Sequence, residues 1–361
     1  MKIGIVTFHR ALNYGALLQA FALQYALTKL DAEPYLLDYR NPVIENLYSY
    51  PTFSERKTLK EKIKFLIQGK FEIERREKFE KYRKQFLNLS ENIYTPDNIG
   101  LSSDKYDLFI TGSDQVWNYD AHNFDANFFL KFVNQKSKKF SYAASFGVSS
   151  IPDTHKDVYF DLLNDFSMCS VREEQGIHIL DGLGISQRRL DIDPTMLLTK
   201  EEWKTQFNIP QKSDEKYIFV YYFDLTNTLR DYIENLSNET GYTVIYIGNP
   251  FKSPFKCKNK ALKTADPIEF IYALSNAEYV VTNSFHGTAL SIIFNKNFYV
   301  ELLKKYAKVN SRIDNILKMF NLENHLICRT RSLEETDWSC VNKKMEELRS
   351  RSLEYLGGLI K

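Results

Sequence analysis

The sequence has no paired-cysteine motif, no long apolar run and no large excess of either charge. Its four cysteines are far apart and show neither a CxxC nor a Cys/His ligand spacing, so we expect neither a disulfide framework nor a metal site: Cys169, Cys257, Cys328 and Cys340. No apolar run reaches ~18 residues, which argues against a membrane-spanning helix. The net charge of +2 argues against a nucleic-acid partner, because such proteins usually carry a strong basic excess.

Two further sequence motifs are missing, and their absence narrows the class of protein. There is no GxGxxG motif, and therefore no signal for a nicotinamide cofactor. The apolar residues 3–6 are followed too soon by His9 and Arg10 to read as a secretory signal. Together with the unpaired cysteines, this predicts a reduced, cytoplasmic setting, with the inner face of the membrane as an alternative location.

The 361 residues are too many for one ordinary core, and 43% apolar with 26% charged residues is normal for a globular protein, so two domains are expected. Short apolar strands alternate with helical segments, which predicts doubly wound parallel sheets. We expect strands at 3–8, 34–39, 107–111, 140–144, 168–171, 190–192, 217–222, 243–247, 279–282 and 298–301. Helices are expected at 16–30, 227–239, 267–275, 286–294 and 341–356.

The polar segment 208–215 predicts a boundary that divides the chain into domains 1–212 and 213–361. The fold class is therefore α/β, with two Rossmann-like domains facing a cleft in a GT-B-like arrangement. The helix at 341–356 is expected to pack back on the first domain. Residues 55–88 form a charged helical insertion, which is either a solvated face or a basic surface for anionic lipid or a lipid-linked diphosphate.

The most informative segment, residues 283–288, lies between an apolar strand and a helix. A helix start offers free N–H groups to an anion, and ligands of open α/β sheets bind beyond the carboxyl ends of the strands. His286 stands at this point as a candidate acid or base, and Ser284, Gly287 and Thr288 leave room for a ligand. The alternative is a histidine that only caps or packs the loop.

Two further loops are candidates for binding a sugar. After the strand at 107–111, polar side chains match sugar hydroxyls and an indole covers the apolar face of a ring: Ser113, Asp114, Gln115 and Trp117. Asp114 would order the acceptor or act as a base; alternatively it caps a turn and Trp117 is a core residue. After the first strand, Asn13 and Gly15 face the same cleft, or else cap and pack the first helix.

Two arginines are candidates for binding an anion. Arg172 follows the strand at 168–171, and its planar donors suit a carboxylate or phosphate, unless it is paired with Glu173 or Asp193. For Asp193 the sequence favours a structural role, capping a turn or orienting Arg172. Arg312 precedes the helical run 313–320 and is expected to join a helix start in holding an anion, near a group of basic residues: Lys304, Lys305 and Lys308.

Several of these motifs, in order from about residue 3 to 320, resemble the polysaccharide pyruvyl transferase family: residues 13–16, 112–117, 141–147, 171–173, 193–195 and 283–287. The resemblance implies transfer of a pyruvyl group from phosphoenolpyruvate to two hydroxyls of a sugar, or of a lipid-linked oligosaccharide, with release of phosphate and without a metal or other cofactor. It implies that His286 is the general acid/base, that Arg172 and the helix start hold the donor, and that Asp114 and Asn13 position the acceptor.

These inferences give two groups of expected binding residues. The donor group is Arg172, Ser284, His286, Gly287, Thr288 and Arg312. The acceptor group is Asn13, Gly15, Ser113, Asp114, Gln115 and Trp117. The sequence departs from the family at Phe285, where some members carry Arg, and at Asn297, where Pro is common. Two alternatives remain open: an inverting glycosyltransferase that uses a nucleotide sugar, and a non-catalytic carbohydrate-binding member of a polysaccharide assembly complex.

Overall fold

The computed structural model describes residues 1–210, 215–248, 253–303, 307–328 and 336–360, with the backbone alone at 307–310. Its first sheet has five parallel strands in the order β3 (Leu89–Tyr94), β2 (Glu33–Tyr39), β1 (Lys2–Val6), β4 (Leu108–Thr111), β5 (Lys139–Ser141). Isolated bridges from Phe140 to Met168 and from Ala144 to Val171 continue this order to the pair β6 (Cys169–Val171) and β7 (Arg188–Leu190).

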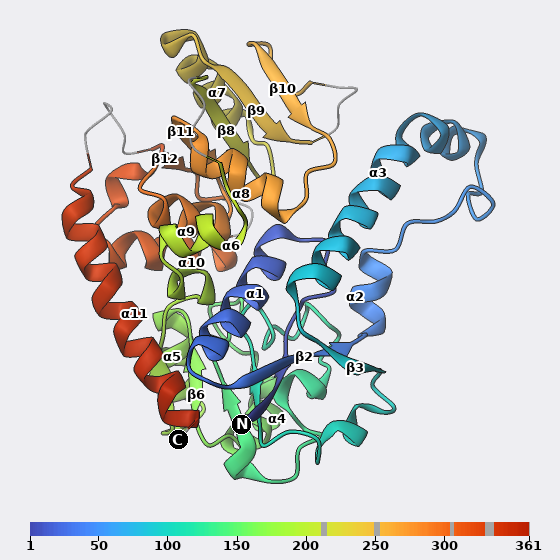
Figure 1. The fold of residues 1–361 in the computed structure, drawn as a ribbon, viewed down its shortest axis with the longest axis vertical. Helices are drawn as coiled ribbons and strands as arrows, with labels where there is room; N and C mark the ends of the chain where they lie inside the picture. Colours follow the sequence, from blue (N-terminus) through green and yellow to red (C-terminus); the bar gives the residue numbers. More distant parts are fainter. Residues whose placement is uncertain (211–214, 249–252, 304–306, 329–335, 361) are drawn as a thin grey trace.

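The second sheet repeats the same order: β10 (Asn259–Leu262), β9 (Thr243–Ile247), β8 (Tyr217–Tyr221), β11 (Tyr279–Thr282), β12 (Asn297–Val300), again all parallel. Figure 1 shows the two sheets in separate parts of the molecule, each with helices packed against it. The predicted α/β class with two Rossmann-like, GT-B-like domains is confirmed. The predicted boundary after residue 212 lies outside the described residues.

The helices that connect these strands begin at recognisable signals. Asn13 accepts a hydrogen bond from the Ala16 N–H at the start of α1, and Thr58 and Asp266 form capping boxes at the starts of α3 and α8. The α-helices are α1 (Tyr14–Lys29), α2 (Pro42–Leu47), α3 (Leu59–Phe86), α4 (Asp153–Asn164), α5 (Glu174–Gly182), α6 (Lys200–Gln206), α7 (Asn227–Thr240), α8 (Pro267–Asn276), α9 (Phe285–Ile293), α10 (Ala307–Met319) and α11 (Trp338–Ile360). The described 3-10 helices are η1 (Ile99–Ser102), η2 (Ala126–Phe129), η3 (Lys136–Lys138), η4 (Pro194–Leu197) and η6 (Glu323–His325).

Two helices are apolar on all sides and therefore lie inside the molecule rather than on its surface. In α1, 12 of 16 residues are buried, and in α9 all nine are. One continuous apolar core includes Ile5 of the first sheet, Phe219 of the second, and residues of both helices. Because the two domains share this core, the loops that begin α1 and α9 are held in a fixed position relative to one another.

The long helix α3 contacts both domains along its second half. Phe79 is fully buried beside Tyr14 of α1, with ring centroids 5.1 Å apart. On its other side Lys78 Nζ lies 2.9 Å from Glu269 of α8, and the Thr264 hydroxyl donates to Glu74 at 2.9 Å. The first half of α3 extends away from both domains (Figure 1). Of the described helices, none is long and apolar enough to cross a membrane.

Helix α11 returns from the second half of the chain to the first domain, as predicted. Arg349 Nε donates to the Met196 carbonyl at 2.9 Å, and the Ser352 hydroxyl donates to Asp191 at 2.9 Å. Figure 1 shows α11 running along one side of the molecule past both parts. The helix thereby covers η4, which directly follows the buried residue Asp193.

Candidate active site between the two domains

The start of α1 meets the start of α9 at a contact between Gly15 and His286. A Cβ built on Gly15 would lie 2.0 Å from Nδ1 of the imidazole, far inside any real contact distance. Only glycine therefore leaves room for this ring. The sequence predicted Gly15 as an acceptor contact, whereas in the structure it receives the imidazole of the opposite domain.

A pocket of about 240 Å³ opens beside this contact. Six predicted site residues line it: Asn13, Asp114, Gln115, Ser284, His286 and Arg312. The remaining lining residues are Phe8, Ala11, Ala16, Ile44, Leu47, Tyr48, Ala121, Phe223 and Phe285. The pocket is therefore polar on the side of the helix starts and apolar on the side of α2.

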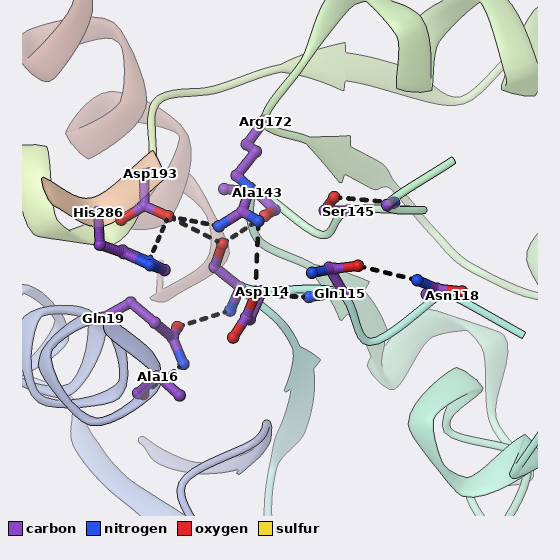
Figure 2. A network of polar contacts seen from close by, with 12 residues as sticks. Ala16, Gln19, Asp114, Gln115, Asn118, Ala143, Ser145, Arg172, Asp193 and His286 are labelled. Carbon is purple, nitrogen blue, oxygen red and sulfur yellow. Dashed lines mark hydrogen bonds and ion pairs between the residues drawn. The ribbon is translucent and has the colours of Figure 1, made fainter. Parts of the chain in front are cut away.

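Behind the pocket, Asp193 joins groups from both domains. Its Oδ2 lies 2.8 Å from Arg172 Nη1 and 3.7 Å from His286 Nε2. Figure 2 draws both contacts as dashed lines. Its Oδ1 accepts the Thr195 N–H at 3.0 Å, so the predicted capping and orienting role of Asp193 is confirmed. Burial alone would raise the pKa of this carboxyl, but the imidazole, the Arg172 charge and the Thr195 N–H outweigh it and hold the pKa below its ordinary value.

Arg172 supports the pocket and does not line it. Its side chain is 0% exposed, and its guanidinium also lies 3.5 Å from Asp114 and 3.5 Å from Glu173. Its Cζ stands 4.4 Å from the centroid of the Phe285 ring. Burial disfavours the charge, but the three carboxylates outweigh burial and raise the pKa of the guanidinium. Arg172 is therefore ion-paired, which is the alternative that the sequence analysis considered for it.

Arg312 occupies the position that the sequence assigned to Arg172. The side chain lines the pocket, and within the described part of the chain no carboxylate forms an ion pair with it. Burial and the nearby Arg172 charge lower the pKa of Arg312 to about 10. With its amide oxygen turned toward the guanidinium, Gln115 accepts from both Nη atoms at 3.3 Å. A buried cation at a pocket wall that forms no ion pair with the described carboxylates is a suitable group for an anionic ligand.

One detail of the Arg312 prediction is wrong. The residue does not lie at a helix start, because α10 begins at Ala307 and carries Arg312 in its second turn. The basic residues predicted near it, Lys304 and Lys305, lie outside the described residues, as does the side chain of Lys308.

Asp114 and Gln115 form the opposite polar wall. The Asp114 carboxylate accepts the Gln115 N–H at 2.9 Å, and its side chain is 13% exposed. The preceding residue, Ser113, is fully buried: its N–H donates to Gln19 Oε1 at 3.0 Å and its hydroxyl donates to the Ala143 carbonyl. Ser113 thus fixes the loop and does not reach the pocket.

The structure corrects the prediction for Trp117. It is 0% exposed, and its ring packs against Phe129, Phe146 and Phe166 in the core of the first domain. An indole with no exposed face does not stack on a sugar, so the prediction of an acceptor contact is wrong and the core alternative is right.

Gly287 and Thr288 are also absent from the pocket wall. The Thr288 hydroxyl donates to the Ser284 carbonyl at 2.9 Å, inside α9. A Cβ on Gly287 would lie 2.4 Å from Thr282 Oγ1, so this glycine allows the helix to approach its own strand. Both residues hold the start of α9 in place and leave Ser284 and His286 at the surface of the pocket.

The sequence analysis missed the apolar wall formed by Ile44 and Leu47 of α2, Tyr48 directly after it, and Phe223. These residues lie in a six-residue helix and a loop, where single aromatic or aliphatic side chains give no recognisable pattern. Among the described residues, no group of three or more His, Cys, Asp and Glu side chains is arranged to hold a metal ion.

The sequence profile of the polysaccharide pyruvyl transferases matches residues 13–300, most of the chain. The chain belongs to the polysaccharide pyruvyl transferase family. In this family member the matched range contains the two helix starts and the charge network around Asp193, while Arg312 lies beyond it. No functionally curated protein is significantly similar in sequence.

Three solved structures with a similar course of the chain have titles that name a UDP-GlcNAc 2-epimerase, a protein bound to UDP and a UDP-glucosyltransferase. The UDP-GlcNAc 2-epimerase of Methanocaldococcus jannaschii is 14% identical, with 98% of this chain and 100% of that chain covered and a TM-score of 0.45. MnaA of S. aureus, solved with UDP, is 13% identical, with 99% and 90% covered and a TM-score of 0.49. A UDP-glucosyltransferase of Polygonum tinctorium is 12% identical, with 99% and 98% covered and a TM-score of 0.40.

Proposed function

We propose that this protein transfers the pyruvyl group of phosphoenolpyruvate to two hydroxyls of one sugar residue of a surface polysaccharide or its precursor. The family supports a pyruvyl transferase. The observation that carries the proposal is that His286 and Arg312, both buried, line one pocket between the domains, with Asp193 3.7 Å behind the imidazole.

His286 is the general acid of this proposal. Its Nε2 is directed at the Asp193 carboxylate, which fixes the orientation of the ring. The other ring nitrogen, Nδ1, lies next to Gly15. Because Nε2 faces Asp193, we assign the proton exchange with the ligand to Nδ1.

Arg312 and the first turn of α9 hold the donor. The N–H groups of Phe285 and His286 belong to the first turn, which has no intrahelical acceptors for them, and the helix dipole favours an anion at this end. Phosphoenolpyruvate carries two anionic groups, a carboxylate and a phosphate. We assign one to Arg312 and the other to the helix start, and we give Arg172 the role of keeping Asp193 and Phe285 in position.

The acceptor sugar lies against Asp114, Gln115 and Asn13. The Asn13 side-chain oxygen already caps α1, so its amide nitrogen is the group left for a hydroxyl. Tyr48 and Phe223 supply the apolar surface that pairs with a sugar ring, the role expected of Trp117.

The reaction balances as follows. The proton from His286 adds to the methylene carbon of the donor, which becomes a methyl group, while the first sugar hydroxyl adds to the adjacent carbon and returns its proton to His286. The second hydroxyl then forms a bond to the same carbon as the bond to the phosphate oxygen breaks, and its proton leaves with the phosphate. The products are a cyclic ketal with a free carboxylate and inorganic phosphate.

The test incubates the protein with a panel of sugars and either phosphoenolpyruvate or nucleotide sugars, and measures phosphate release and acceptor mass. The proposal expects an acceptor heavier by pyruvic acid less water, formed only with phosphoenolpyruvate, and absent with His286→Ala. A mass gain of one sugar from a nucleotide donor would identify a glycosyltransferase. Sugar binding without any mass gain would identify a carbohydrate-binding protein.

A further inference from the structure

The first half of α3 and the segment before it form an arm that projects from the body of the molecule (Figure 1). Large aliphatic side chains on this half-helix face solvent: Leu59 is 75% exposed, Ile63 49%, Leu66 70% and Ile67 51%, and Ile73, just after it, is 41% exposed. Most exposed apolar residues stand alone on a protein surface, but these five recur at helical spacing and form one stripe.

The stripe is not the face that the arm uses for its own packing. Phe65, on another side of the helix, packs against Tyr50 and Phe53 with ring centroids 5.8 and 6.0 Å away. Arg56 lies over the same ring at 4.6 Å. The arm therefore has a small aromatic contact of its own, and the aliphatic stripe remains uncovered on its outside.

Charge is concentrated on the same arm. Residues 55–70 contain six cations and only two carboxylates, Glu55 and Glu61: the cations are Arg56, Lys57, Lys60, Lys62, Lys64 and Lys70. This 16-residue segment carries a net charge of +4, whereas the whole chain carries +2. By helical position, Lys60 and Lys64 lie beyond one edge of the stripe and Lys62, whose Nζ is 5.6 Å from the Phe53 ring centroid, beyond the other, while Lys70 lies within the stripe.

We propose that this arm lies on an anionic lipid bilayer, with the stripe in the acyl boundary and the lysines at the headgroups. A helix with an aliphatic face bordered by lysines is the pattern of an interfacial membrane helix. Long lysine side chains keep their ammonium groups in the headgroup layer while their stems cover apolar surface. The charge excess supplies the attraction to anionic lipid.

The arm also directs the pocket toward the membrane. Helix α2 directly precedes it, and Ile44 and Leu47 of α2, with the next residue Tyr48, form the apolar wall of the pocket. Leu47 is 69% exposed, so this wall continues to the surface on the side of the arm. This step rests on the proposed function: an acceptor attached to a membrane lipid would reach the pocket past α2.

The experiment is vesicle flotation with the full chain. Vesicles of phosphatidylcholine alone are compared with vesicles that contain about one third phosphatidylglycerol, at low and high salt. The wild type is expected to float with the anionic vesicles and to dissociate as salt rises. The double variant Leu66→Ser/Ile67→Ser and the variant Lys62→Glu/Lys64→Glu should each bind at least about tenfold more weakly.

The matched control is Leu101→Ser, because Leu101 in η1 is 72% exposed but lies outside the arm. It should bind like the wild type. Failure of the wild type to float, or equal flotation of the stripe variant, overturns the proposal. So does a dimer in light scattering that the stripe variant dissociates, since a second copy would then cover the stripe.

Vesicle binding needs no turnover, so its outcome is separate from that of the proposed reaction. With a short soluble acceptor the stripe variant should keep the wild-type rate. Flotation without any pyruvyl transfer would refute the reaction and leave the docking surface standing, whereas transfer without flotation would do the reverse.

Discussion

Replacing Gly15 by Ala tests the contact on which the site depends. The added Cβ would lie 2.0 Å from Nδ1 and 2.2 Å from Cγ of His286, whereas non-bonded heavy atoms pack at about 3.5 Å from one another. The imidazole must therefore move by more than ~1 Å, and a displacement of that size costs about a hundredfold in rate. Overpacking at this buried contact should also lower the free energy of unfolding by about 1–3 kcal/mol.

The assay is phosphate release from phosphoenolpyruvate with an accepted sugar, alongside the melting temperature of each variant. Gly182→Ala at the end of α5 is the control, because no atom lies within 4 Å of its added Cβ. The double variant Gly15→Ala/His286→Ala removes the ring that the methyl group strikes, so it should melt like His286→Ala alone. A folded Gly15→Ala protein with the wild-type rate, or a double variant that keeps the full stability loss, would refute the reasoning.

Three further predictions address the residues around this contact. His286→Ala should fold like the wild type but lose at least about a hundredfold in kcat, measured as phosphate release; a loss below tenfold would exclude it as the acid. Arg312→Met should raise the melting temperature, because it removes a buried cation that has no carboxylate partner among the described residues, and should abolish the thermal shift caused by phosphoenolpyruvate; an unchanged ligand shift would contradict its role. Asp193→Asn should lower the free energy of unfolding at neutral pH by about 3–5 kcal/mol, since it leaves the Arg172 charge without its nearest partner. Because the folded-state pKa of Asp193 is depressed, its contribution is present above about pH 4 and is lost as the pH falls, so urea unfolding of the variant should show a weaker acid dependence than the wild type, and parallel pH curves would contradict this.

The strands predicted from sequence were the apolar and buried ones, including the edge strand β12. Residues 243–247 and 279–282 match β9 and β11, because buried strands are continuous apolar runs. The two missed strands, β3 and β10, are both at sheet edges and are largely polar and exposed. These two edge strands bury few side chains, so the apolar pattern on which the prediction depends is absent from them.

The site was predicted as far as local signals reach. Strand ends and helix starts placed His286, Ser284, Asp114 and Asn13 at one cleft. The sequence could not show that Arg312 lines the pocket while Arg172 forms ion pairs, because burial and pairing depend on which carboxylates the fold brings near each guanidinium. The prediction for Trp117 was wrong for the same reason, because an indole beside polar residues gives the same sequence pattern in a sugar site and in a core.

The course of α11 constrains how this protein can be made. Tyr355 donates to the Ser141 carbonyl at 3.1 Å, and Arg351 Nη donates to the Leu190 carbonyl at 2.8 Å, although more than 150 residues separate the partners. During synthesis, this face of the first domain is therefore covered only after residues 338–360 have left the ribosome. A nascent chain arrested before that point would leave η4 exposed. A chaperone bound to that chain would contact the apolar surface of η4.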